Sequence, residues 1–142
     1  MEKKRLLIAD ASEEFRMALQ ESLQGAYMIR ACREGSEVLQ VLESFKPDVM
    51  IVNVMLPGVD GVTVLQRAEA RGLRTTVMAM IRFQSDYLLD ALERLNVSYV
   101  MTKPCEISAI VARLEDILAE KQEKIGEITQ PDVCTLVDNA LR

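Results

Sequence analysis

The sequence predicts an α/β domain in which five parallel strands form one doubly wound sheet with helices on both faces. Short apolar runs alternate with amphipathic segments five times along the chain. The amphipathic segments are long enough to be crossover helices, which are the connections that parallel strands require. At 142 residues, 49% of them apolar, the chain is also long enough to bury one sizeable core.

Each predicted strand is a short apolar run bounded by turn or polar residues. The first follows the basic start of the chain and stops before Asp10, and the third stops at Asn53. The strands are expected at residues 5–9, 27–32, 49–52, 75–80 and 98–101. In a doubly wound sheet, ligands bind beside the carboxyl ends of the strands, so the residues that follow each run are the candidate site.

Each predicted helix carries apolar residues on one face. The first opens at Ser12 and is closed by Gly25. Asp60 is expected to be the N-cap or a turn residue ahead of the third. In the fourth, Leu88 and Leu92 lie four residues apart and share a face. The later helices are expected at residues 34–45, 62–71, 85–95 and 106–123.

The last residues differ from the rest in pattern. The main domain is expected over residues 1–122, followed by a linker and a short amphipathic helix over residues 123–142. The apolar residues of that helix recur at helical spacing, and Asp132 could serve as its N-cap: Val133, Leu136, Val137, Ala140, Leu141. Two interpretations stay open, namely a helix that folds back or pairs between chains, and the start of a truncated effector domain.

Composition excludes several classes of function. The net charge of −5 and the pI near 4.9 argue against direct nucleic-acid binding by this domain. Three widely spaced cysteines predict neither a disulfide framework nor a zinc site. Without histidine, a Ser-His-Asp or Cys-His arrangement is impossible, so we expect no enzyme activity and no cofactor. No apolar run approaches the roughly 20 residues that span a bilayer, so we expect no membrane insertion and a cytoplasmic protein.

The stretch from Val49 to Gly61 is the most informative part of the chain. A buried strand ends at Asn53, and a loop with Pro57 and two glycines follows before the next helix. This pattern, together with Lys103-Pro104 after the fifth strand, resembles the receiver domain of bacterial two-component response regulators. The resemblance implies a receiver-like, flavodoxin-type fold. It also implies that an aspartate accepting a phosphoryl group would stand where this chain has Asn53.

The resemblance also assigns roles to other positions, and several of them depart from the family. Asp10 matches the first of two acidic metal-binding residues, but Ala11 stands at the second. The Met55 backbone carbonyl would be a further ligand, and Lys103 and Pro104 match the family. Met80 aligns with the hydroxyl-bearing switch residue and Val100 with the aromatic one. We expect poor magnesium affinity, and a contact between Asp10 and Lys103 that holds the strand ends together.

The predicted function is that of a phosphorylation-independent pseudo-receiver, a regulatory protein-interaction module of a transcription regulator. In the family, partners or a second copy dock on the fourth helix, fifth strand and fifth helix. The candidate residues of that surface here are Leu88, Leu92, Tyr99 and Arg113. The run 98–104 further resembles the sporulation master regulators of Gram-positive spore formers.

Two other functions stay open. One is a small-ligand sensor that uses the emptied phosphoryl pocket, lined by Asp10, Met55 and Met80. The other is a phosphorelay receiver with an unusual acceptor, Asp10 or Asp60. Phosphoryl transfer needs metal-assisted charge neutralisation, which ranks the second alternative last.

Overall fold

The computed structural model describes residues 3–126 of the chain, with side chains described through residue 120. Five strands and five helices alternate along it: β1 (Lys4–Ala9), α1 (Glu13–Leu23), β2 (Tyr27–Cys32), α2 (Gly35–Phe45), β3 (Val49–Asn53), α3 (Gly61–Ala70), β4 (Thr76–Ile81), α4 (Asp86–Arg94), β5 (Tyr99–Thr102) and α5 (Ile107–Gly126). The predicted α/β architecture is confirmed, and most element ends shift by only one or two residues.

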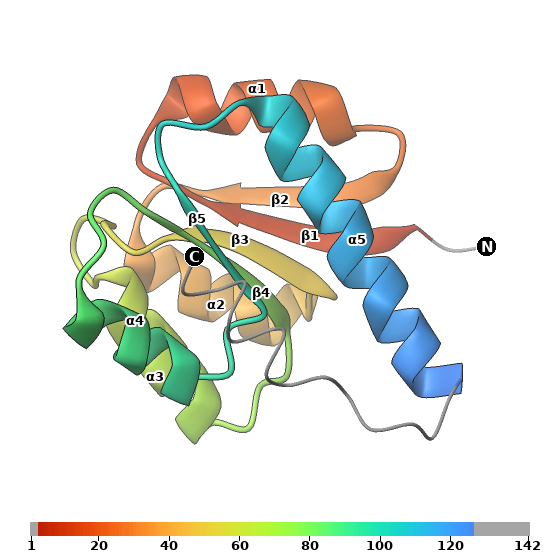
Figure 1. Ribbon diagram of the computed structural model, residues 1–142. Helices are drawn as coiled ribbons and strands as arrows, with labels where there is room; N and C mark the ends of the chain where they lie inside the picture. The colour runs from red at the N-terminus through yellow and green to blue at the C-terminus, as the bar shows by residue number, and fades with distance from the viewer. Residues whose placement is uncertain (1–2, 127–142) are drawn as a thin grey trace.

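The strands form one parallel sheet in the order β2-β1-β3-β4-β5 (Figure 1). The order reverses direction at β1, which is where a doubly wound sheet opens a crevice beside its strand ends. β3 pairs with β4 so that Asn53 lies in register with Met80. All strands run the same way, so the residues that follow β1, β3 and β5 meet at one edge of the sheet.

Two helical layers cover the sheet, with α1 and α5 on one face and α2, α3 and α4 on the other (Figure 1). On the first face, Leu19 of α1 and Ile110 and Leu114 of α5 are fully buried against the strands. On the second face, Val38 of α2 and Val64 of α3 are fully buried in a separate cluster. Apolar burial on both faces of the sheet is the main favourable term for folding.

The loops that surround the site are held by caps and by close backbone contacts. The Ser12 side chain accepts a hydrogen bond from the Phe15 N–H at 3.1 Å, and the Asp60 side chain accepts one from the Thr63 N–H at 2.9 Å. Ser12 is thus the N-cap of the helix predicted to open there, and Asp60 is an N-cap, one of its two predicted roles. At Gly35 an added Cβ would lie 1.8 Å from the Val59 carbonyl oxygen, so the start of α2 presses directly on the loop after β3.

The last helix departs from the prediction. α5 continues to Gly126, three residues past the predicted end at residue 123, so the first residues assigned to the linker are helical. The predicted amphipathic helix of the tail lies outside the described residues. No helix in the described part of the chain is both long enough and apolar enough to cross a membrane.

Candidate functional site

The site is organised around Asp10, which directly follows β1 and is 2% exposed. Its Oδ1 accepts a hydrogen bond from the Ser12 N–H at 2.9 Å. Its Oδ2 accepts one from the Lys103 Nζ at 2.7 Å and one from the Asn53 Nδ2 at 3.2 Å. The expected contact between the ends of β1 and β5 is therefore present, and both carboxylate oxygens are occupied by donors.

Asn53 connects this ion pair to the loop that follows β3. While its Nδ2 donates to Asp10, its Oδ1 accepts a hydrogen bond from the Met55 N–H at 2.9 Å. An amide suits this position because the Asp10 carboxylate needs a hydrogen-bond donor and the Met55 N–H needs an acceptor. A carboxylate here would place an anionic oxygen beside the Asp10 carboxylate, which is unfavourable without a bound cation.

Lys103 is fixed by contacts on several sides. Its ammonium lies 3.7 Å from the centroid of the Phe15 ring, within the range of a cation–π interaction. Its backbone N–H donates to the Ile81 carbonyl at 2.7 Å, which anchors the end of β5 on β4. The Lys103-Pro104 peptide is cis. The contact of Phe15 with Lys103 was not predicted, because nothing in the local sequence distinguishes a phenylalanine at the site from one that packs in the core.

The residues at this edge do not fit a divalent-cation site. Ala11 is exposed and offers no oxygen from its side chain. The Asp10 oxygens and the Asn53 Oδ1 are already used by internal donors. Among the described residues there is no group of three or more acidic, cysteine or histidine side chains that could hold a metal ion. Magnesium requires near-octahedral oxygen coordination, which these groups do not supply.

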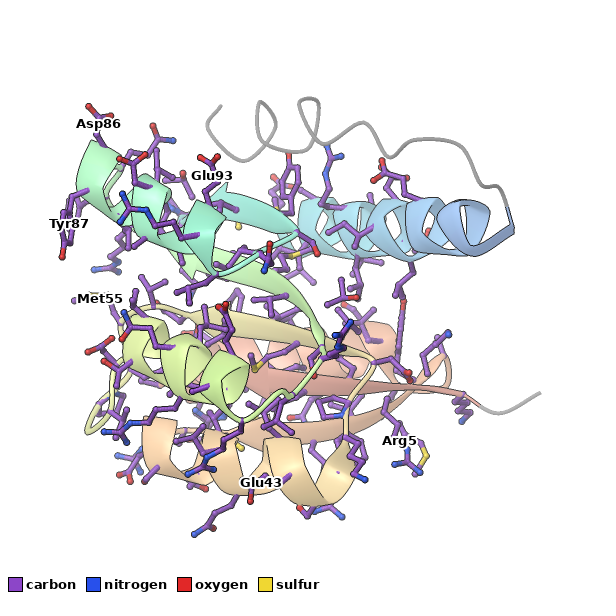
Figure 2. The ribbon with its side chains drawn as sticks, turned by 90° about the horizontal axis from the view of Figure 1, so that it is seen from below. Arg5, Glu43, Met55, Asp86, Tyr87 and Glu93 are labelled. Carbon is purple, nitrogen blue, oxygen red and sulfur yellow. The ribbon has the colours of Figure 1, made fainter. Side chains whose placement is uncertain are left out.

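The two methionines expected to line an emptied pocket do not do so together. Met80 is fully buried among the residues that pack against α1 and α5, so its side chain is a core residue. The Met55 side chain is 67% exposed and lies at the same edge of the domain as Tyr87, opposite Arg5 (Figure 2). The expectation of one cavity lined by both methionines and Asp10 is wrong.

The last two residues of β4, Met80 and Ile81, are both apolar, so the switch position lacks a hydroxyl whichever of them occupies it. Ile81, the residue after Met80, is 1% exposed and packs on the other face of the sheet. Val100 of β5 is also buried, at 8% exposure. None of these side chains can donate a hydrogen bond to an anion.

The predicted interaction surface is only partly exposed. Tyr99 and Arg113 are partly buried, and the Arg113 guanidinium lies 4.3 Å from the centroid of the Tyr99 ring. Leu88 is also partly buried. Leu92 is 1% exposed and belongs to the core between α4 and the sheet, so its assignment to the surface is wrong. Its spacing from Leu88 placed it on the apolar face of α4, and that face turns inward.

The two cysteines in the described part of the chain are packing residues. Cys32 is 3% exposed, and burial together with the nearby Glu37 carboxylate raises the pKa of its thiol to about 11. Cys105 is partly buried, and burial raises its thiol pKa even though the Lys103 ammonium acts in the opposite direction. Neither environment favours the reactive thiolate.

Comparison with known proteins places this geometry in a family. A family model described as the response regulator receiver domain matches residues 6–115. The chain is 32% identical over 121 residues to protein-glutamate methylesterase/protein-glutamine glutaminase 3 of Rhodospirillum rubrum, covering 82% of this chain and 33% of that protein. It is 27% identical over 120 residues to the alkaline phosphatase synthesis transcriptional regulatory protein PhoP of Bacillus subtilis, covering 84% of this chain and 50% of that protein.

Solved structures agree on the fold. A CheY-like response regulator receiver domain protein from Methanospirillum hungatei superposes with a TM-score of 0.79 at 16% identity, covering 87% of this chain and 99% of that one. The receiver domain of Francisella response regulator 1452 gives a TM-score of 0.76 at 18% identity, covering 84% and 99%. At such identities the likeness concerns the fold alone. The chain spans about half the length, or less, of the curated relatives named above.

Proposed function

The chain belongs to the response regulator receiver domain family, and we propose that it is a member that regulates by binding protein without accepting a phosphoryl group. The observation that carries the proposal is the hydrogen bond from the Asn53 amide to Asp10, which is itself paired with Lys103. These three side chains sum to zero charge, and the backbone N–H groups of Ser12 and Met55 occupy the remaining oxygens of Asp10 and Asn53. The site is complete without a metal ion or a phosphoryl group.

The nature of the acceptor supports this proposal first. Attack on phosphorus requires a nucleophilic oxygen with a lone pair free to form the new bond. A carboxamide is a far weaker nucleophile than a carboxylate. The Asn53 oxygen, moreover, already accepts the Met55 N–H at 2.9 Å. The residue is therefore suited to holding the loop after β3 rather than to reacting.

The lack of groups that could neutralise a bound phosphoryl group also supports the proposal. A transferred phosphoryl group brings negative charge that metal ions and cationic side chains must neutralise. The residues present do not fit the metal, and the Lys103 ammonium already neutralises Asp10 at 2.7 Å. A phosphoryl group at this edge would lack both its activating cation and a free lysine.

In this proposal the domain exerts its regulatory effect by binding another protein. The surface formed by α4, β5 and α5 carries Leu88, Tyr99 and Arg113, of which Arg113 also lies 3.8 Å from Asp116. A protein partner or a second copy of the chain would bind there. The net charge of −5 makes direct nucleic-acid binding by this domain unfavourable.

We further propose that this domain is the regulatory part of a cytoplasmic transcription regulator rather than of an enzyme. Relatives include DNA-binding and transcriptional regulatory proteins, each much longer than the matched region. The absence of histidine from the sequence favours this over a hydrolytic role for the domain itself. The resemblance to sporulation master regulators points in the same direction.

The alternatives have less support. A ligand sensor in the emptied phosphoryl pocket would need space between Met55 and Met80, but Met80 is fully buried and Met55 points outward. An unusual acceptor at Asp60 would need a free carboxylate. Both of its oxygens are engaged, one by the Thr63 N–H at 2.9 Å and one by the Thr63 hydroxyl at 3.0 Å.

The decisive test is incubation with acetyl phosphate and magnesium, followed by intact-protein mass spectrometry. We expect no added phosphoryl group on the natural chain. The matched comparison is Ala11→Asp/Asn53→Asp, which restores both carboxylates and should bind magnesium and gain one phosphoryl group. A phosphoryl adduct on the natural chain would disprove the proposal, and its position would identify the acceptor.

The interaction surface has its own test. Arg113→Glu reverses a charge on α5 and removes the contact with Tyr99, while Arg67→Glu makes the same change on α3, on the other face of the sheet. Analytical ultracentrifugation of the two variants should show altered self-association, or altered binding of a captured partner, for Arg113→Glu alone. Equal effects of the two variants would disprove this assignment of the surface.

A further inference from the structure

We propose that a groove beside the Asp10–Lys103 pair binds a small amphipathic anion, that is, an aromatic or aliphatic body carrying one carboxylate. The groove has a volume of about 630 Å³ and lies between α1, the loop after β4 and the loop after β5. That volume is within the range of about 300–1,000 Å³ typical of small-molecule sites. The proposal concerns a ligand and does not depend on whether Asn53 can be phosphorylated.

The walls of the groove are mostly apolar. Phe15 and Ala18 come from α1, Ile107 begins α5, and Phe83 belongs to the loop after β4. Phe83 is 79% exposed, so a large aromatic surface stands in water at the groove. Covering it with an apolar ligand would remove that area from water, which favours binding before the entropic costs of association are counted.

Positive charge gathers at the same groove. The lining includes Arg82 and Lys103, against a single carboxylate from Glu14 at the exposed start of α1. Lys103 is balanced by Asp10 behind it, at 2.7 Å. Arg82 forms no ion pair or hydrogen bond with any side chain that the structure describes. Its guanidinium is therefore the charge available to a carboxylate, which it can hold through two parallel hydrogen bonds.

The helix arrangement strengthens the preference for an anion. The N-terminal ends of α1 and α5 both contribute residues to the lining, Ser12 for the first and Ile107 for the second. Each helix carries partial positive charge at this end. Glu14 sits in the first turn of α1, where it interacts with that helix end and offsets part of the field. The sum of Arg82 and the two helix ends still favours a single negative group.

The test is a titration of the isotope-labelled protein with phenylbutyrate, followed by NMR. We expect saturable shifts centred on the amides of Ala18, Cys105 and Ile107. The neutral analogue phenylbutyramide should bind at least tenfold more weakly, because it lacks the charge that Arg82 recognises. Arg82→Gln should weaken phenylbutyrate binding at least tenfold, whereas the control Arg94→Gln, at the far end of α4, should leave it unchanged.

Three results would overturn the proposal. One is the absence of saturable shifts, and another is a set of shifts centred away from the groove. The third is equal binding of the acid and the amide, or of the Arg82→Gln and Arg94→Gln variants. Arg82 and Arg94 are both exposed, so neither substitution should disturb the fold. Unchanged NMR signals from residues away from the substituted positions would verify this. Phe83→Ser gives a second check, since it removes the apolar wall and should weaken the acid and the amide alike.

Discussion

The Nδ2 of Asn53 donates a hydrogen bond to the Oδ2 of Asp10 across 3.2 Å, and these residues follow or end two neighbouring strands of the sheet. The amide thus takes the place of a charge that would otherwise face Asp10. Because Lys103 shares the same carboxylate oxygen, the three strand ends β1, β3 and β5 are joined through one atom.

Restoring a carboxylate at position 53 alone should destabilise the domain. Asn53→Asp would replace the hydrogen bond with repulsion between two carboxylates, at a cost of about 1 to 3 kcal/mol at neutral pH without divalent cations. Urea denaturation in the presence of a chelator would measure the change. Asn53→Ala serves as the control, since it removes the hydrogen bond without adding charge. An Asn53→Asp variant more stable than Asn53→Ala would contradict the repulsion.

Removing the lysine should be more damaging than removing both members of the ion pair. Lys103→Met leaves the charge of Asp10 buried, at 2% exposure, and should lower the free energy of unfolding by about 3 to 5 kcal/mol. Asp10→Asn/Lys103→Met eliminates that uncompensated charge and should recover part of the loss. Urea denaturation midpoints of the two variants would compare their stabilities. If the double variant were as unstable as Lys103→Met, the charge of Asp10 would not be the cause.

The buried Cys32 thiol predicts a loss of stability in alkali. Its pKa is raised to about 11 from 9.0, so above pH 9 the unfolded chain releases this proton more readily than the folded one. The contribution of this group to the free energy of unfolding is therefore full below pH 9 and falls as the pH rises toward 11. Denaturation at pH values across that window should show a steeper decline for the natural chain than for Cys32→Ala. The burial-raised pKa values of Tyr27 and Cys105 act in the same direction and would remain in the variant.

Gly35 predicts a purely steric effect at the start of α2. Gly35→Ala would place a Cβ 1.8 Å from the Val59 carbonyl oxygen, so the loop after β3 would have to move. We expect a loss of about 3 kcal/mol, at the upper end of typical overpacking costs. Ser36→Ala changes the exposed neighbouring position and should alter stability by less than about 0.5 kcal/mol. Thermal unfolding of both variants would test this, and equal midpoints would show that the loop yields freely.

Much of the fold could be predicted from local patterns. The alternation of apolar runs and amphipathic segments located all ten elements, and the helix caps at Ser12 and Asp60 followed from side-chain chemistry alone. The contact between Asp10 and Lys103 was expected from the resemblance to receiver domains, which places both residues at the pocket. Short-range pattern accounts for the elements and the caps, and the family resemblance accounts for the ion pair.

The parts that were missed depend on details of packing. Leu92 was assigned to a surface although its spacing on α4 matches the buried face, where it is 1% exposed. Met55 and Met80 were expected to share a cavity, but Met80 is fully buried in the core whereas Met55 is 67% exposed. The groove beside Lys103 was not anticipated because it combines three segments that are distant in the sequence. No local pattern reports such a combination.

The pairing of Asp10 with Lys103 has a consequence for how the protein is made. The two residues are 93 positions apart, so a growing chain exposes Asp10 long before its counter-ion exists. At synthesis rates of about 5 to 20 residues per second, that interval is roughly 5 to 20 seconds. During it, the carboxylate at the end of β1 favours contact with water over burial in a sheet. The end of β1 is therefore expected to be buried late, after β5 has left the ribosome.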